Sequence, residues 1–309
     1  MRRIIIDCDP GIDDAEAIMM AYQHPETKIE AITTVAGNVG VDKTTANALK
    51  ILDVLDAEPI PVFRGAHTAL AGHREDASFV HGEDGLGDVG IPESKRKAED
   101  EHAALALIRL AKENPGELEL IAIGPLTNLA LALRLDPELP SRYKQLVIMG
   151  GAYLGQGNTI NLPAEFNIFA DPDAAAVVFD NWPMLTMVSW EATMAHGMPI
   201  EQFKDMFDTD TPRGHFLKKV TKKTIEFLTT VLKRDMSYAA DPLAMAVFLE
   251  PDIVLESEMK YVQIERFGQV CRGMTVVDWW GFTQKEPNTN IIINVNQQRF
   301  NGLLKSAVE

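Results

Sequence analysis

Short apolar runs alternate, along the first two thirds of the chain, with longer segments whose apolar residues recur at helical spacing. The short runs predict strands, and the longer segments predict amphipathic helices. Strands are expected at Arg3–Asp7, Ile29–Val35, Ile60–Phe63, Leu118–Ile123, Gln145–Met149 and Leu185–Trp190. Helices are expected at Asp14–His24, Lys43–Leu55, His102–Lys112, Leu126–Leu135 and Pro172–Asn181. This alternation is typical of right-handed crossovers and a mainly parallel sheet.

The pattern changes after Trp190. Longer helices are expected at Thr211–Lys233 and Tyr238–Leu249, and short strands at Gln263–Glu265, Thr275–Val277 and Ile291–Asn294. No linker-like stretch and no internal repeat interrupts the sequence. We therefore predict a single domain over residues 1–309 with an α/β fold. Its core would be an open, mainly parallel, Rossmann-like sheet flanked by helices, with a C-terminal helical and β elaboration.

The chain is acidic, with 29 Lys and Arg against 45 Asp and Glu, a net charge of -16. This charge repels nucleic acid and anionic membrane surfaces. No apolar stretch approaches the length of a membrane span. We therefore expect a small-molecule partner, and neither nucleic acid nor a membrane.

Cysteine usage and the N-terminus both favour a cytoplasmic protein. Cys8 and Cys271 cannot form a disulfide framework, and Cys8 lies in an apolar run where a reduced, buried thiol is expected. The first residues, MRRIIIDCDPG, place three isoleucines before the first aspartate. That run is much shorter than the apolar core of a secretory signal.

Polar and glycine-rich segments follow most of the predicted strands. They are Asp7–Asp14, Gly37–Asn38, Gly65–Ala66, Gly124–Asn128, Gly150–Asn158 and Glu191–Thr193. In open α/β sheets the ligand site lies beyond the carboxyl ends of the strands. We expect these segments to converge on one crevice.

The string DCDPGIDD carries four carboxylates, at Asp7, Asp9, Asp13 and Asp14. Carboxylates so close together repel one another, and a bound cation is the natural counter-charge. Oxygen ligands favour Ca²⁺ or Mg²⁺ over zinc, and no zinc-ligand spacing is present. The alternative is that Asp13 or Asp14 caps the helix that follows.

Three other polar positions have ordinary structural interpretations. Asp171 precedes Pro172 and is expected to cap a helix, and Asp241 before Pro242 has the same signature. His81 lies in the loop HGEDGLGD, where a lone histidine is usually solvated. Neither a dinucleotide-binding nor a P-loop motif occurs in any of these segments.

Several motifs, in order along the chain, resemble one family. DCDPGIDDAEAI is similar to the N-terminal signature of the nucleoside hydrolases of the inosine–uridine-preferring type, which reads close to D-x-D-P-G-x-D-D-A-x-A-I. Further similar segments are VAGNV at Val35–Val39, HGEDGLGD at His81–Asp88, GPLTNLA at Gly124–Ala130, MGGAY at Met149–Tyr153, AEFNIFADPDAA at Ala164–Ala175, DP at Asp241–Pro242 and RGMTVVD at Arg272–Asp278.

The resemblance implies Ca²⁺-dependent hydrolysis of the N-glycosidic bond of a ribonucleoside, in nucleoside salvage or catabolism. By position in the motifs, the Ca²⁺ ligands would be Asp9, Asp14, Asp241 and the backbone carbonyl of Ile123. Asp9 would also be the general base on the metal-bound water. Relatives are usually dimers or tetramers, so a homo-oligomer is implied as well.

The same resemblance assigns the substrate contacts. The positions that hold the ribose hydroxyls would be Asp13, Asn38, Asn158, Glu165 and Asn167. His81 matches a catalytic position beside the base. The residues themselves agree with a neutral nucleoside, because a carboxylate cluster stabilises an oxocarbenium-like transition state and repels phosphate.

One position departs from the family pattern. Many members carry a histidine, the acid for the leaving base, immediately before the aspartate matched by Asp241, and this chain has Ala240 there. The departure leaves open a catalytically silent nucleoside- or ribose-binding protein of the same fold. A second alternative is a haloacid-dehalogenase-like phosphatase with Asp7 as nucleophile, which Pro10–Gly11 and Asp13–Asp14 fit poorly.

Overall fold

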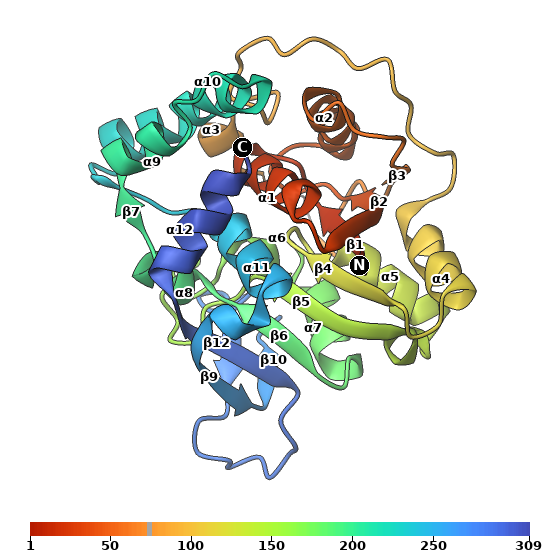
Figure 1. Cartoon of the computed structure of the whole chain (residues 1–309). Coiled ribbons are helices and arrows are strands. Elements are labelled where there is room, and N and C mark those ends of the chain that lie inside the picture. Colours follow the sequence, from red (N-terminus) through yellow and green to blue (C-terminus); the bar gives the residue numbers. More distant parts are fainter. Residues whose placement is uncertain (73–75) are drawn as a thin grey trace.

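The computed structural model describes residues 1–72 and 76–309, which are built around one eight-stranded sheet (Figure 1). In spatial order its strands are β3 (Val62–Arg64), β2 (Thr27–Thr34), β1 (Arg2–Cys8), β4 (Leu118–Ala122), β5 (Tyr143–Met149), β6 (Leu185–Val188), β12 (Thr289–Val295) and β9 (Val254–Lys260). All neighbours are parallel except β12 and the edge strand β9, which are antiparallel. The expected α/β class is confirmed.

Helices cover both faces of the sheet (Figure 1). One face packs against α1 (Ile12–Gln23), α2 (Val41–Val54), α10 (Pro212–Glu226), α11 (Ala240–Leu249) and α12 (Gln297–Ser306). The other packs against α4 (Ala103–Glu113), α5 (Thr127–Leu135) and α7 (Pro172–Asn181). Strand β1 shows why helices pack on both faces of the sheet, since it has apolar side chains on each face. Ile4 and Ile6 enter the first core and Ile5 the second, because successive side chains of a strand point to opposite faces.

Shorter elements complete the fold. They are α3 (Ser78–His81), α6 (Phe166–Ala170), α8 (Trp190–Ala195), α9 (Ile200–Met206), the pair β7 (Met198–Pro199) with β8 (Met236–Ser237), and the pair β10 (Val262–Ile264) with β11 (Thr275–Val277). Single 3-10 turns occur at Leu139–Arg142 and Pro251–Ile253, and a π turn at Phe227–Val231.

The strand order places a topological switch between β1 and β4. After β1 the chain builds β2 and β3 on one side, and it then returns to build β4, β5 and β6 on the other. The segments that leave the carboxyl ends of β1 and β4 therefore diverge and open a crevice between them. Asp9 follows β1 and Ile123 follows β4, so both lie at this switch.

The structure corrects several expected boundaries. The strand expected to reach Trp190 ends at Val188, because the Ser189 hydroxyl accepts the N–H of Ala192 and caps α8. The helix expected to continue to Lys233 is α-helical only to Glu226. Strand β9 and helix α12 were not predicted. Most of β9 is exposed, so it lacks the apolar alternation from which strands are inferred.

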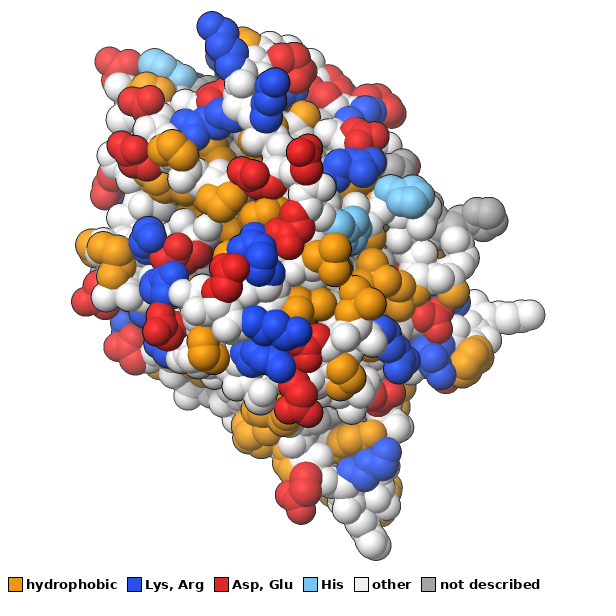
Figure 2. Space-filling view, turned by 90° about the vertical axis from the view of Figure 1, so that its right-hand side faces the viewer, with side chains coloured by type: hydrophobic (Ala, Val, Ile, Leu, Met, Phe, Trp, Pro, Cys, Tyr) orange, Lys and Arg blue, Asp and Glu red, His pale blue; other side chains and the backbone are white. Residues whose placement is uncertain are grey.

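Two observations bear on the expected partners. No helix among the described residues is long and apolar enough to cross a membrane. On the face that Figure 2 shows, Lys and Arg side chains are interspersed with Asp and Glu side chains and do not gather in one basic patch.

Candidate active site

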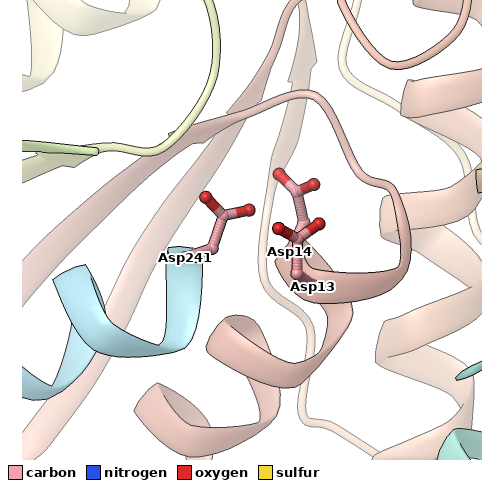
Figure 3. Close-up of side chains that lie close together, drawn as sticks. All are labelled: Asp13, Asp14 and Asp241. Atoms are coloured by element: carbon pink, nitrogen blue, oxygen red, sulfur yellow. The ribbon is translucent and has the colours of Figure 1, made fainter. Parts of the chain in front are cut away.

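The candidate site forms where the loop after β1 meets the first turns of α1 and α11. Asp13 and Asp14 come from the first turn of α1, and Asp241 comes from the first turn of α11. Figure 3 shows the Asp241 carboxylate on the side of α11 that faces these two aspartates. One carboxylate oxygen of each residue lies within 4.8 Å of the other two. The fold thus brings together acids from opposite ends of the sequence.

Asp14 organises the loop that precedes it. Its carboxylate accepts the backbone N–H groups of Asp9 at 3.1 Å and Gly11 at 2.9 Å, and the side-chain amide of Asn38 at 3.1 Å. Neither of the paired aspartates is the N-cap of α1, which is Gly11, but Asp14 accepts the N–H of that N-cap residue from the third helical position, as in a capping box. This does not remove Asp14 from the acidic cluster, because a carboxylate oxygen has more than one lone pair.

Asp241 does not cap α11, and that interpretation is wrong. The helix already begins at Ala240, its N-cap residue is Ala239, and no side chain caps it. Asp241 therefore lies inside the first turn, where its carboxylate reaches the cluster on α1. By contrast, Asp171 caps α7 as expected, because it accepts the N–H of Ala174 at 3.0 Å.

Asp9 is buried beside the cluster. Its Oδ2 accepts the backbone N–H of Asn38 at 2.6 Å, and its Oδ1 has no hydrogen-bond partner among the described residues. The backbone approaches so closely that a Cβ at Gly37 would lie 2.0 Å from Oδ2, and one at Gly124 would lie 2.5 Å from Oδ1. Asp9 is not one of the residues whose oxygens lie mutually within 4.8 Å, whereas Asp13 is.

The electrostatics of the cluster are those of acids without a counter-ion. Burial raises the pKa of Asp14 to about 7 and raises the pKa values of Asp9 and Asp241 well above the ordinary value. Repulsion between neighbouring carboxylates raises all three pKa values further. Within residues 1–72 and 76–309, no Lys or Arg forms a salt bridge with any of them. The cluster is therefore suited to a bound cation.

Asp7, the remaining acid of the motif, points away into the core. Its Oδ1 accepts hydrogen bonds from the Thr33 hydroxyl at 2.5 Å and the Asn128 amide at 2.9 Å. Burial raises its pKa to about 7. Asp7 is thus part of the packing that connects β1 to its neighbours.

His81, at the end of α3, lies against the start of α1. Its Nδ1 accepts the backbone N–H of Ile12 at 3.1 Å and lies 3.9 Å from an oxygen of Asp13. Burial lowers the pKa of the imidazole, although the nearby Asp13 acts in the opposite direction. Because Nδ1 accepts the N–H of Ile12, it carries no proton in this geometry, and the proton of the ring is assigned to Nε2.

Glu165 and Asn167 brace the loops that follow β4 and β5. Glu165 caps α6 and also accepts the N–H of Gly151 at 2.9 Å, and burial raises its pKa to about 7. The Asn167 amide donates to the carbonyl oxygens of Ile123 at 3.0 Å and Met149 at 3.1 Å. The carbonyl expected as a metal ligand thus has Asn167 as its neighbour.

Asn158 lies further out. It is exposed in the loop after β5, and its backbone N–H donates to the carbonyl of Ala164 at 3.2 Å. Sequence reasoning missed Glu191, which it included only as the start of a polar segment. In the structure the Glu191 carboxylate is buried and accepts backbone N–H groups of this same loop.

Comparison with known proteins gives the class of this site. Residues 4–302 match the model of the inosine-uridine preferring nucleoside hydrolase family. The inosine-uridine preferring nucleoside hydrolase of Crithidia fasciculata is 35% identical over 100% of this chain and 98% of its own length. The pyrimidine-specific ribonucleoside hydrolase RihA of Salmonella paratyphi C is 34% identical over 99% of this chain and 98% of its own length. A solved inosine-guanosine nucleoside hydrolase has a TM-score of 0.92 and 36% identity, covering 99% of this chain and 98% of that one.

The chain belongs to the inosine-uridine preferring nucleoside hydrolase family, and it is an enzyme that hydrolyses ribonucleosides. The resemblance in the motifs is confirmed. Neither a phosphatase of the haloacid-dehalogenase type nor a catalytically silent binding protein agrees with these matches. Ala240, the departure from the family pattern, is buried at the start of α11 beside Asp241.

Proposed function

We propose that this hydrolase binds one Ca²⁺ in the carboxylate cluster and uses Asp9 as the general base in N-glycosidic bond cleavage. One observation carries the proposal. Three buried or half-buried carboxylates meet within 4.8 Å, and the unpartnered Oδ1 of the buried Asp9 belongs to the loop that precedes Asp13 and Asp14. No Lys or Arg of the described residues forms an ion pair with these acids, and His81 approaches Asp13 only at 3.9 Å.

The residues present fit a hard cation. Every donor at the site is an oxygen, which suits Ca²⁺ with its six to eight oxygen ligands. The ligands we propose are the carboxylates of Asp9, Asp14 and Asp241 and the carbonyl of Ile123, with Asp13 alongside. A cation held there supplies a lowered pKa for a water molecule and neutralises the repulsion among the acids.

The chain's own groups then have separate tasks. Asn38 holds one oxygen of Asp9 at 2.6 Å, which leaves Oδ1 oriented to take the proton of the attacking water. As the glycosidic bond breaks, positive charge develops on the ribose. The surrounding carboxylates stabilise this charge, and their effect is large because the site is buried.

We assign ribose binding to Asp13, Asn38, Asn158, Glu165 and Asn167. For Asn167 the hydrogen bonds indicate which side-chain atom would contact the ribose. Its amide nitrogen already donates to the carbonyls of Ile123 and Met149, so its Oδ1 is the atom that accepts from a ribose hydroxyl.

For the leaving base we assign proton donation to His81. Its Nδ1 is occupied by the N–H of Ile12, so donation would come from Nε2. This neutral imidazole is a weaker acid than an imidazolium.

The experiment is metal analysis joined to activity. Purified protein should contain about one Ca²⁺ per chain, the content of a single oxygen cage. Removal of the ion with a chelator should abolish release of reducing sugar from a ribonucleoside, and added Ca²⁺ should restore it. Full hydrolase activity in a metal-free preparation would contradict the proposal.

A further inference from the structure

Side chains from three separate elements hold the loop after β5. Glu165, at the start of α6, accepts the N–H of Gly151 at 2.9 Å. Thr275, on β11, both accepts from the N–H of Ala152 and donates to its carbonyl, each at 2.8 Å. The next residues of the loop are held by Glu191, on α8. This is the most extensive anchor of the three.

The Glu191 carboxylate is surrounded by backbone donors. Its Oε2 accepts the N–H of Tyr153 at 2.9 Å, and its Oε1 accepts those of Leu154 at 2.8 Å and Gln156 at 3.1 Å. The residue is only 6% exposed. Converging N–H groups of a turn form a binding place for an anion, and here a side chain of the protein occupies it.

Capping does not account for Glu191. The N-cap of α8 is Ser189, whose hydroxyl accepts the N–H of Ala192 at 3.3 Å. Glu191 lies in the first turn of the helix, next to Trp190, whose backbone N–H donates to the carbonyl of Gly151. The start of α8 is therefore attached to the loop both through its backbone and through this carboxylate.

The held loop leads directly to the ribose side of the site. The N–H of Gly157 donates to the carbonyl of Leu162 at 2.8 Å, and the N–H of Asn158 donates to that of Ala164 at 3.2 Å. Ala164 is followed immediately by Glu165. Residues 153–156, which Glu191 holds, are thus continuous with the segment that carries Asn158 and that its own backbone bond joins to Ala164 beside Glu165.

We propose that Glu191 is a positioning residue for substrate binding, which acts by fixing the loop that carries Asn158. The proposal rests on the proposed function, in which Asn158 and Glu165 hold ribose hydroxyls. In this role Glu191 acts through the loop, because its carboxylate is taken up by three backbone N–H groups. Loss of its carboxylate allows the loop to adopt other conformations, and substrate binding then requires the loop to be ordered again.

The test is a double-mutant cycle with Glu191→Gln, Asn158→Ala and the combined variant. Glutamine keeps one acceptor oxygen but places an N–H₂ group against a backbone N–H, so part of the anchor is lost. We expect Glu191→Gln to raise KM about tenfold with little change in kcat, and Glu191→Ala to raise it further. The combined variant should resemble Asn158→Ala alone, because the two residues act as one unit.

Asp278→Asn is the matched control. Asp278 also accepts two backbone N–H groups, from Phe282 at 2.9 Å and Thr283 at 2.7 Å, but it does so in the exposed β11–β12 loop. This variant should leave KM unchanged. Circular dichroism, melting temperature and Ca²⁺ content, measured on every variant, separate loss of fold or metal from loss of positioning.

Each result has one meaning. Additive effects on KM, or an unchanged KM in Glu191→Gln whether or not its melting temperature falls, would overturn the positioning role. If Asn158→Ala leaves KM unchanged, the ribose-binding assignment of Asn158 fails, and the positioning role fails with it. Should Glu191→Ala not fold, Glu191→Gln still decides.

Discussion

The central sheet has an amino edge, where its parallel strands begin, and a carboxyl edge, where they end. Buried acids at these two edges differ in whether a basic side chain of the protein neutralises them. At the amino edge, Glu119 on β4 accepts three hydrogen bonds from Arg2, with a closest distance of 2.5 Å, and Glu30 on β2 accepts one from Arg3 at 2.8 Å. At the carboxyl edge, Asp9 and Asp14 are more deeply buried, yet their partners in the described chain are backbone N–H groups and Asn38.

The pKa values show the difference. Burial alone would raise the pKa of Glu119, but the hydrogen bonds and charge of Arg2, together with Gln145 and Lys144, outweigh burial and lower it. Burial raises the pKa values of Asp9 and Asp14, and neighbouring carboxylates raise them further. The same sheet thus contains one set of acids with counter-charges from the protein and one set without. The second set is suited to a cation, or to positive charge that develops on a substrate.

The largest expected effect is the loss of catalysis in Asp9→Asn. The amide keeps the shape of the side chain but cannot accept the proton of a water molecule. We expect kcat to fall by about 10²–10⁴, or about 3–5 kcal/mol, with unchanged circular dichroism. Steady-state kinetics with a ribonucleoside provide the measurement.

Glu119→Gln is the control from the opposite edge. It removes half of an ion pair and should cost about 1–3 kcal/mol of unfolding free energy, with kcat within about twofold of the parent enzyme. An Asp9→Asn variant with unchanged kcat, or a Glu119→Gln variant that is folded but inactive, would show that the contrast between the edges is not functional.

The second effect is on stability, through Ca²⁺ and pH. Without metal, the folded-state pKa of Asp14 is about 7, above its value of about 4 in the unfolded chain. The folded protein then binds more protons than the unfolded chain between these values, so stability falls as pH rises through this window. The lowered pKa of His81 makes stability rise with pH, but this is one group against the three acids Asp9, Asp14 and Asp241, whose pKa values are raised.

Bound Ca²⁺ replaces the protons that the cluster loses. At 1,000 times its Kd it should add about 4 kcal/mol, and the rise in melting temperature should be larger at pH 7.5 than at pH 5.5. Thermal denaturation with chelator and with Ca²⁺ at both pH values tests this. In Asp14→Asn the effect of Ca²⁺ should shrink at both pH values. An equal rise at both values in the parent protein would argue against metal binding by these acids.

The helices and the carboxylate motif show what the sequence could predict. Helix α7 has the predicted bounds, Pro172–Asn181, because Asp171 and Pro172 mark its start through local hydrogen bonding. The acids of the loop after β1 were likewise visible as one string. Such features depend on residues that are close in sequence, so a single segment is enough to predict them.

Other parts of the site depend on contacts between distant segments. Asp241 resembles a cap in its own segment, and its position in the cluster follows from the packing of α11 against α1. Asp13 was assigned to ribose alone, yet its oxygen lies with those of Asp14 and Asp241. Glu191 could not be assigned because its partners are backbone N–H groups, which leave no trace in the residue types of the loop.

A third effect concerns the charge of the substrate, because the acids of the carboxyl edge should repel an anionic substrate. The carboxyl edge offers acids where a phosphate would need Arg or Lys. One additional negative charge about 8 Å from an acid costs about 2 kcal/mol at an effective dielectric constant of about 20. We therefore expect kcat/KM for a nucleoside 5′-monophosphate to be at least about 30-fold lower than for the nucleoside. Comparable values for inosine and its monophosphate, or uridine and its monophosphate, would contradict this reading of the site.

The smallest expected effect concerns Ala240, which lies immediately before Asp241 and offers no proton to the leaving base. If protonation limits the rate, a p-nitrophenyl riboside, whose leaving group needs little protonation, should be cleaved well relative to natural nucleosides. Ala240→His should then raise the ratio of natural to activated rates by about tenfold. This gain is smaller than the 10²–10⁴ of an evolved acid, because the surrounding pocket was not built for the new ring. Ala240→Asn, similar in bulk but not acidic, is the matched control and should leave the ratio flat.

A flat ratio in Ala240→His would mean that another group already protonates the base. His81 is then the residue to change, since its ring contacts the start of α1 and lies 3.9 Å from Asp13. His81→Gln should lower the rate with natural nucleosides more than the rate with the activated riboside if its Nε2–H is the donor. Equal losses on both substrates would instead place His81 among the residues that shape the site through the N–H of Ile12. The two substitutions together therefore determine whether this edge of the sheet supplies only negative charge to the reaction, or a proton as well.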